Sequence, residues 1–193
     1  MENENPRERW YVLFVRTNSE DRILKALRRK VDSERVKVFV PKAVRSYGKK
    51  VTVQTDKGTE TKKVYIKEKK LCFPGYVFIS SQASAAEFAE EIVPIATNVD
   101  GSFCFLNYGE DKSDIAMRGS EKSLLERLMG EGYCIEPSKG YKEGDKIVIT
   151  EGTLMGLEGR ITKVNVNRRV VTLAVDLMGS IREVMVMIDM TKN

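Results

Sequence analysis

The sequence of 193 residues contains no histidine, only one tryptophan and only three cysteines. The lack of histidine removes the side chain that most often acts as a general base near neutral pH and that most often binds metals. Cys72, Cys104 and Cys134 lie far apart and include no CxxC pair, which disfavours a zinc site. We therefore expect no catalytic residue, no metal site and no cofactor.

Long apolar runs and a secretion signal are also missing. No run approaches the roughly 18 apolar residues that a membrane-spanning helix needs, and residues 1–9 are too charged for a signal peptide. Dispersed cysteines in odd number are most simply interpreted as buried, reduced thiols. Gly152, Gly156 and Gly159 lack the lysine of a phosphate-binding loop, so we assign them to turns and close packing. These features indicate a cytoplasmic protein without a membrane contact.

Positive charge is modest overall but concentrated in one segment. The formal net charge is +5, whereas residues 42–70 alone carry ten Lys or Arg against three acidic residues, a local excess of +7. The segment includes Lys49, Lys50, Lys62 and Lys63. Such a concentration predicts contact with a polyanion such as nucleic acid. Lysines that only keep an exposed hairpin soluble are an equally simple alternative.

The first 130 residues alternate between strand-like and helix-like segments. Strands are expected at 10–15, 36–40, 76–80 and 103–106, and helices at 19–30 and from residues 84 and 120 onward. A long hairpin is expected over 44–69, with Asp56-Lys57-Gly58 as its turn. Helices that alternate with strands in this order predict an α+β sandwich around an antiparallel sheet.

Three serine or threonine residues have the spacing of helix caps. Thr17 with Glu20, and Ser84 with Glu87, match the capping box, in which each side chain bonds the backbone of the other residue. Ser120 precedes a helical leucine pattern and is expected to cap the last helix of the domain.

The last quarter of the chain predicts a small antiparallel barrel. Short apolar runs at 147–149, 170–175 and 184–188 are separated by turns rich in glycine and asparagine. Residues 131–141 contain glycine and proline without periodicity and are interpreted as a linker. Packing of Tyr133, Cys134 and Ile135 on the first domain is an open alternative, in which the linker is only partly free.

The order of three motifs resembles the NusG family over nearly the whole chain. The motifs are Trp10-Tyr11-Val12-Leu13-Phe14-Val15, then Phe73-Pro74-Gly75-Tyr76-Val77-Phe78-Ile79, and a glycine-rich loop in which Gly159 matches the central glycine of the KOW motif. The resemblance implies an N-terminal NusG-type (NGN) domain at 1–130, a linker at 131–141 and an SH3-like KOW barrel at 142–193. It further implies a processive transcription elongation factor that is not an enzyme.

The family resemblance also implies a polymerase contact. In the family, the FPGY segment and neighbouring aromatics line an apolar cavity for the clamp helices of the β′ subunit of RNA polymerase. Phe73, Pro74 and Tyr76 match this segment, and Trp10 and Phe14 on the first strand would complete the patch. The alternative is that these residues form the domain core; by strand alternation, Phe78 is expected to be core and to share a face with Tyr76.

Nucleic-acid contacts are expected from two regions. In the family the hairpin region lies near the non-template DNA strand, so its four named lysines are candidates for phosphate contacts. The barrel offers further candidates, namely Arg160, Lys163, Arg168, Arg169 and Arg182. The alternative for these cations is ordinary surface charge. The barrel loop with Leu154, Met155 and Leu157 matches the loop that in the family meets ribosomal protein S10 or the termination factor Rho.

Within the family, the long basic insert, the segment 114–127 and the arginines of the barrel are similar to LoaP, a specialised antiterminator paralogue. This similarity implies antitermination within long operons and recruitment through an RNA hairpin in the leader. A housekeeping NusG that couples polymerase to the ribosome or Rho is the first alternative. A ribosome-associated KOW protein without a polymerase role is the second. We expect a monomer.

Overall fold

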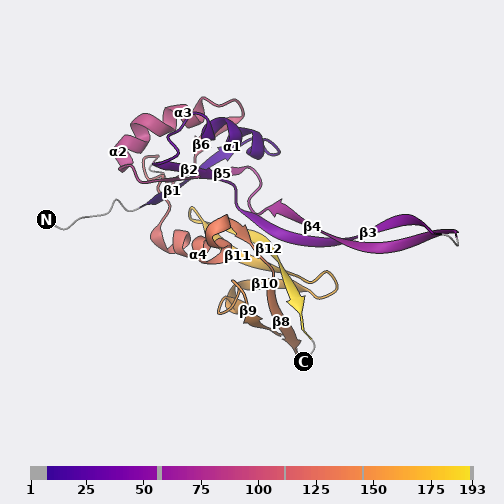
Figure 1. Ribbon diagram of the computed structural model, residues 1–193. Helices are drawn as coiled ribbons and strands as arrows, with labels where there is room; N and C mark the ends of the chain where they lie inside the picture. The colour runs from indigo at the N-terminus through magenta and orange to yellow at the C-terminus, as the bar shows by residue number, and fades with distance from the viewer. Residues whose placement is uncertain (1–7, 56–57, 111, 145, 192–193) are drawn as a thin grey trace.

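The structure is a computed structural model that describes residues 8–55, 58–110, 112–144 and 146–191. It consists of an N-terminal α+β domain, a long two-stranded hairpin that projects from this domain, and a C-terminal barrel (Figure 1). Among the described residues, no helix has both the length and the apolar character that crossing a bilayer requires.

The N-terminal domain is built on a four-stranded antiparallel sheet in the order β2-β5-β1-β6. Its strands are β1 (Arg9–Val15), β2 (Val36–Phe39), β5 (Tyr76–Ser81) and β6 (Ser102–Phe105). Tyr11 and Leu13 of β1 point to one face of the sheet, where Ile23 and Phe88 cover them. The elements on this face are α1 (Glu20–Arg28), α2 (Ala85–Glu87), the π-helical turn η1 (Phe88–Ile92) and α3 (Val93–Thr97).

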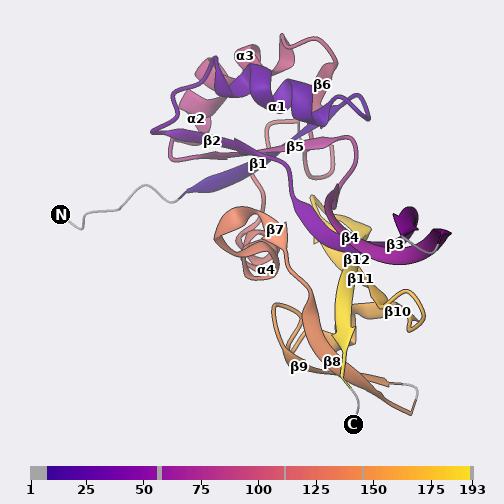
Figure 2. The same cartoon turned by 45° about the vertical axis from the view of Figure 1, so that its right-hand side comes forward.

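The opposite face of the sheet faces the C-terminal half of the chain. Trp10, Val12 and Phe78 lie on this face and belong to a core that includes Leu125 and Leu128 of α4 (Gly119–Met129). Phe78 is fully buried and Tyr76 packs against the same core, which confirms that the two residues share a face. In Figure 2, α4 lies between the four-stranded sheet and the barrel.

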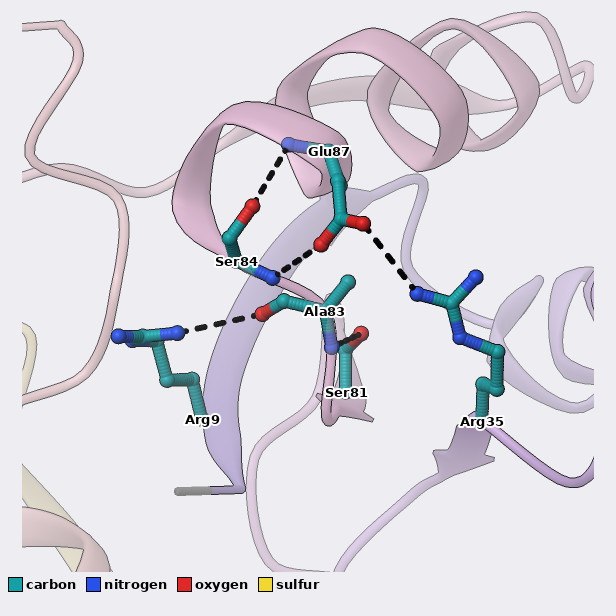
Figure 3. Close-up of polar contacts among 6 residues, drawn as sticks. All are labelled: Arg9, Arg35, Ser81, Ala83, Ser84 and Glu87. Carbon is teal, nitrogen blue, oxygen red and sulfur yellow. Dashed lines mark hydrogen bonds and ion pairs between the residues drawn. The ribbon is translucent and has the colours of Figure 1, made fainter. Parts of the chain in front are cut away.

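The capping box at Ser84 is confirmed. The Ser84 hydroxyl accepts a hydrogen bond from the Glu87 N–H at 3.2 Å, and the Glu87 carboxylate accepts one from the Ser84 N–H at 2.8 Å (Figure 3). Arg35 forms an ion pair with the same carboxylate at 3.7 Å. The bonds from Ser84, with a smaller effect of Arg35, hold the pKa of Glu87 below its ordinary value. Two arginines thus frame this turn, because Arg9 donates to the Ala83 carbonyl at 3.2 Å.

The other two predicted caps are wrong. The N-cap position of α1 is Ser19, without a side-chain cap bond, and Glu20 does not reach back to Thr17. Glu20 is instead buried and accepts a hydrogen bond from the Gly75 N–H at 2.6 Å. The Glu20 carboxylate therefore accepts from the backbone of Gly75, which is distant in sequence, and not from the backbone of Thr17. Helix α4 begins one residue before Ser120, which lies inside the helix, and its N-cap residue makes no side-chain cap bond.

The predicted hairpin is present and longer than expected. Strands β3 (Lys42–Thr55) and β4 (Gly58–Leu71) pair along their whole length, from Lys42 opposite Leu71 to Thr55 opposite Gly58. The predicted turn residues Asp56 and Lys57 lie outside the described residues. At the base of the hairpin, β7 (Cys134–Ile135) pairs with β3 in parallel, which gives a three-stranded sheet in the order β4-β3-β7.

The predicted linker is therefore not free in this structure. Cys134 and Ile135 are buried at the base of the hairpin, which supports the alternative that this segment packs on the first domain. Tyr133 stacks on Phe39 with ring centroids 3.8 Å apart. The barrel then begins at Ser138, three residues before the predicted end of the linker, since 138–143 form a strand.

The barrel consists of five strands in the order β10-β11-β12-β8-β9. They are β8 (Ser138–Glu143), β9 (Lys146–Glu151), β10 (Ile161–Asn165), β11 (Val170–Leu177) and β12 (Ser180–Met190), with a short 3-10 turn, η3 (Glu158–Arg160), before β10. Another 3-10 turn, η2 (Gly130–Gly132), directly follows α4. All neighbours are antiparallel except β12 and β8. Val171, Leu173 and Val175 of β11 alternate into the core, as the sequence predicts for a half-buried strand.

Buried polar contacts join the barrel to α4. The Glu121 carboxylate is buried and accepts hydrogen bonds from the N–H groups of Met178 and Gly179, both at 3.1 Å, and from the hydroxyl of Tyr108. Burial, reinforced by the hydrogen bond to Glu121, raises the pKa of Tyr108, so the phenol remains a donor. One continuous apolar core spans α4, the sheet face above it and the barrel interior.

Candidate functional site

Three aromatic side chains form an exposed patch on neighbouring strands of the N-terminal sheet. Phe14 of β1 is 39% exposed and Phe103 of β6 is 51% exposed, and Tyr76 of β5 is half-buried. The Phe14 ring lies 5.8 Å from that of Tyr76 and 5.2 Å from that of Phe103, between centroids. We call Phe14, Tyr76 and Phe103 the aromatic patch. Exposed aromatics in contact with one another are typical of a protein-binding surface.

The loop before β5 is held by backbone hydrogen bonds at Gly75. Gly75 has a φ of +86°, in the left-handed region that favours glycine. Its N–H donates to Glu20, and its carbonyl accepts from the Val15 N–H at 2.8 Å. Pro74 is exposed at the tip of this loop, beside the aromatic patch.

Two of the predicted polymerase contacts are core residues. Trp10 is 2% exposed and packs edge-on against Phe39, with ring centroids 4.9 Å apart. Phe73 is 4% exposed and lies 5.6 Å from Phe78, between ring centroids. The structure thus corrects the expectation that these two rings are surface anchors. They pack beneath the surface that carries Tyr76.

Sequence reasoning missed Phe103. Regular alternation would place Phe103 and Phe105 on the same face, yet Phe103 is exposed and Phe105 is buried. The pairing of β1 with β6 shifts its register between Phe14 and Val15, which are opposite Cys104 and Ser102. Phe103 is the extra residue of this bulge, and a bulge turns a side chain away from the regular face. An exposed phenylalanine on a short edge strand leaves no periodic signal.

The aromatic patch meets the barrel at Tyr76. Arg182 of β12 donates a hydrogen bond to the Tyr76 hydroxyl at 2.9 Å, and its guanidinium carbon lies 5.5 Å from the ring centroid. Arg182, predicted as a nucleic-acid contact, is therefore engaged with the N-terminal domain in this arrangement. The predicted contact Arg160 is also engaged, in an ion pair with Asp176 at 3.0 Å.

The four predicted hairpin lysines divide between the two faces of the ribbon. Lys50 lies directly opposite Lys63, and alternation places this pair on one face. Lys49 pairs with Val64, and Lys62 with Val51, on the other face. Like charges directly opposite each other on a sheet repel and destabilise the pair. An anion bound beside Lys50 and Lys63 would therefore relieve their repulsion.

The predicted arginines of the barrel turn are exposed. Arg168 and Arg169 lie in the turn between β10 and β11, and no ion pair involves them among the described residues. The Asn165 side chain accepts from the Arg168 N–H at 2.9 Å, and Arg169 has a φ of +54°. This local bonding fixes the backbone of the turn and leaves both guanidinium groups available.

A groove of about 1000 Å³ lies between the hairpin and the barrel. Its hairpin wall includes Tyr47 and Tyr65, and its barrel wall includes Val164 and Met185. Two acidic residues and seven basic residues line it, the basic ones being Arg45, Lys63, Lys67, Lys70, Lys163, Arg168 and Arg169. We call this feature the basic groove. It brings together Lys63, Lys163, Arg168 and Arg169 from the two separately predicted nucleic-acid regions.

The barrel loop predicted to meet a protein partner is largely buried. Leu154 is fully buried and Leu157 is 8% exposed, and both belong to the shared core. Met155 remains 53% exposed, and its carbonyl accepts a hydrogen bond from Arg127 of α4. Of the three predicted contact residues in this loop, Met155 is the exposed one.

The chemistry of the site is that of binding surfaces. Within the described part of the chain, no cluster of three or more acidic or cysteine side chains is arranged to hold a metal ion. Cys72 and Cys134 are buried, as expected for reduced structural thiols, whereas Cys104 is exposed beside the aromatic patch, contrary to expectation.

Comparison with known proteins matches the fold and the family. A solved structure described as "Domain interaction in Thermotoga maritima NusG" aligns with a TM-score of 0.50 and 18% identity, over 94% of this chain and 93% of that chain. No curated protein matches the sequence. The family model described as "Transcription termination factor nusG" matches residues 8–126, which is more than half of the chain. The chain, with its NGN-type sheet and KOW-type barrel, therefore belongs to the NusG family of transcription factors.

Proposed function

We propose that this protein is a processive transcription elongation and antitermination factor. Its NGN domain binds the β′ clamp helices of RNA polymerase, and its KOW barrel binds an RNA hairpin in the leader of its target operon. The observation that carries the proposal is the pairing of two exposed surfaces in one chain, the aromatic patch of the NGN domain and the unpaired arginine turn of the barrel.

The aromatic patch supports the polymerase contact. Apolar helices bind to surfaces that offer aromatic anchors, and Phe14, Tyr76 and Phe103 offer three neighbouring rings. Pro74 extends the patch at the loop tip. Trp10 and Phe73 belong to the buried core against which Tyr76 packs.

The barrel supports the specialised role over the housekeeping one. Housekeeping members of the family use the loop around Leu154 for ribosomal protein S10 or Rho, and here Leu154 and Leu157 are part of the core. The exposed Met155 is the remaining feature that favours the housekeeping alternative. Arg168 and Arg169 offer an RNA hairpin two guanidinium groups for phosphate contacts or base stacking.

The second face of the hairpin supports a DNA contact. Lys49 and Lys62 do not line the basic groove, and they lie on the ribbon face that carries Val51 and Val64. Cations on an exposed ribbon neutralise phosphates without reading sequence. We assign these two lysines to the non-template DNA strand of the elongation complex.

The polymerase contact is tested with a purified fragment that contains the β′ clamp helices. Tyr76→Ala and Phe14→Ala should each weaken binding of the folded full-length protein by about 2–4 kcal/mol, as expected for interface aromatics. Arg182→Ala should strengthen binding, because it removes the hydrogen bond by which the barrel engages the Tyr76 hydroxyl in this structure. Wild-type affinity in folded Tyr76→Ala would contradict the assignment and favour a ribosome-associated role.

The RNA contact is tested by transcription through a terminator placed behind the candidate leader. The double variant Arg168→Ala, Arg169→Ala should abolish antitermination while binding of the clamp fragment stays at the wild-type level. Full antitermination by this variant would remove the RNA-recruited role and leave the housekeeping function as the better assignment.

A further inference from the structure

The basic groove joins side chains from two parts of the chain that sequence alone assigns to separate ligands. Lys63 and Tyr65 come from the hairpin, and Lys163, Arg168 and Arg169 come from the barrel. The two walls touch at the base of the groove, where the Ser46 N–H donates to the Met187 sulfur at 2.7 Å. The groove is therefore a feature of the assembled molecule.

The apolar lining of the groove distinguishes it from a simple basic patch. Tyr47 is 45% exposed, Tyr65 is 68% exposed and Met185 is 44% exposed, although each has a large apolar surface. Lys63 extends along this wall, with its ammonium nitrogen 5.3 Å from the centroid of the Tyr65 ring. Gly48 lies beneath it, and a Cβ at that position would meet the end of the Lys63 side chain. Flat rings next to cations are what unpaired bases and their phosphates bind.

One donor in the groove has no acceptor. Arg45 lines the groove, and its Nε is buried without a hydrogen-bond partner among the described residues. A buried donor that lacks a partner is unfavourable, and a charged donor gains most from an anionic acceptor. Together with the opposed Lys50 and Lys63, this buried donor supports an anionic ligand for the groove.

We propose that the basic groove binds an unpaired RNA segment, with a base stacked on Tyr65 and phosphates on Lys63, Arg168 and Arg169. The inference rests on the proposed function, in which the barrel's ligand is an RNA hairpin, and it assigns the loop of that hairpin to the groove. A duplex buries its base faces and would use only the cations. The Ser46 hydroxyl and the Asn167 amide line the groove and offer partners for the ribose 2′-hydroxyl.

The test measures binding of the full-length protein to labelled oligonucleotides by fluorescence anisotropy. The probes are an unstructured RNA strand of roughly 12 nucleotides, the DNA strand of the same sequence, and the RNA duplex of the same length. We expect the RNA strand to bind about tenfold more tightly than the duplex, because only the strand can stack a base on Tyr65.

Variants locate the ligand on both walls. Tyr65→Ala should weaken binding of the RNA strand about tenfold, and Tyr65→Phe should retain it, since the ring alone is needed for stacking. Lys63→Ala and Arg168→Ala should each reduce the slope of log affinity against log salt by about 0.7. Lys49→Ala with Lys62→Ala is the matched comparison, because these lysines belong to the same hairpin but do not line the groove, and it should reduce affinity for the RNA strand less than Lys63→Ala does.

Three results would overturn the inference. They are wild-type affinity in Tyr65→Ala, equal losses in the matched comparison and in Lys63→Ala, and equal binding of the DNA and RNA strands. Clamp-fragment binding, measured on the same proteins, separates this inference from the proposed function. If the protein binds the clamp fragment but does not show the expected affinity for the RNA strand, only the groove assignment is wrong. If it binds the RNA strand but not the clamp fragment, the polymerase role is wrong.

Discussion

At the scale of single residues, burial distinguishes the aromatic side chains that are available to a partner from those that pack in the core. Phe73 and Tyr76 lie three residues apart in one loop, and both match the segment that binds polymerase in the family. Phe73 is 4% exposed, whereas Tyr76 is half-buried and offers its hydroxyl at the surface. Two aromatic residues of one motif therefore have different roles, and substitutions should separate them.

We predict that Phe73→Ala lowers the free energy of unfolding by about 3–5 kcal/mol, because it leaves a cavity beside Phe78. Tyr76→Ala should cost much less stability, since its ring is only partly enclosed. Urea denaturation followed by circular dichroism measures both values. A Phe73→Ala protein as stable as Tyr76→Ala would show that Phe73 is not a core residue in solution.

The three thiols should differ in reactivity. Burial, with a smaller contribution from Cys134, raises the pKa of Cys72 from its ordinary 9 to about 12, and burial also raises the pKa of Cys134. Cys104 is exposed. We predict that a thiol reagent at about pH 8 modifies Cys104 alone in the native protein, because only a thiolate within reach attacks it. Cys104→Ser should abolish the fast reaction, and denaturant should expose the other two thiols to the reagent.

The raised pKa of Cys72 also predicts the direction in which the folding stability changes at alkaline pH. The folded state favours the neutral thiol, so this contribution is complete below the ordinary pKa of 9 and is lost as the pH rises toward 12. Cys72→Ala should therefore show a smaller loss of stability across this alkaline range than the wild type. An equal loss in both proteins would place the titrating group elsewhere.

At the scale of elements, the sequence predicts what depends on neighbouring residues. The hairpin and the capping box at Ser84 were predicted correctly, because residues close in sequence determine both. The cap at Thr17 failed because Glu20 bonds Gly75, which is 55 residues away. Phe103 was missed because a bulge interrupts the alternation of β6.

The candidate site was predictable only in its parts. Lys63 and Arg168 were each identified from charge and turn chemistry, but nothing in the sequence places them in one groove. The placement depends on packing of the barrel against α4 and the hairpin base, through contacts such as that of Glu121 with Met178. Periodicity carries no information about such long-range pairs.

Ser84 and Ser120 provide a matched test at this scale, since both occupy predicted cap positions. We predict that Ser84→Ala lowers stability by about 1 kcal/mol, because it removes the acceptor for the Glu87 N–H. Ser120→Ala should be close to neutral, since Ser120 lies inside α4. Thermal and urea unfolding measure both, and equal effects would contradict the assignment of the caps.

The pH dependence of this cap has a defined direction. The folded state lowers the pKa of Glu87, so the stabilising contribution of its carboxylate is present above the ordinary pKa of 4.5 and is lost as the pH falls through the lower folded value. The stability difference between the wild type and Ser84→Ala should therefore shrink in acid.

At the scale of the whole molecule, Glu121 fixes the barrel against the NGN domain. Glu121→Ala would leave the N–H groups of Met178 and Gly179 without their acceptor, at a cost of about 1–3 kcal/mol each if they stay buried. We predict that the variant opens this interface, so that amide hydrogen exchange at Met178 and Gly179 accelerates about tenfold or more.

Glu126 supplies the control for this prediction. It lies on the same helix and pairs with Lys122 at 3.3 Å. Glu126→Gln should leave exchange at the β11–β12 turn unchanged. Unchanged exchange in Glu121→Ala as well would mean that the apolar core alone holds the two domains together.

The projecting hairpin makes the protein a lever (Figure 1). Each arm has 14 residues, which at about 3.3 Å per residue gives a ribbon about 46 Å long. Its fulcrum is the base, where β7 pairs with Lys42 and Ala43 and where Ser46 bonds Met187 of the barrel. The part of β3 beyond Ser46 is about 30 Å long at about 3.3 Å per residue, so a tilt of about 10° at this fulcrum would move the far end by about 5 Å. A small movement of the walls of the basic groove around a bound ligand would thus be amplified into a larger displacement at the far end of the hairpin.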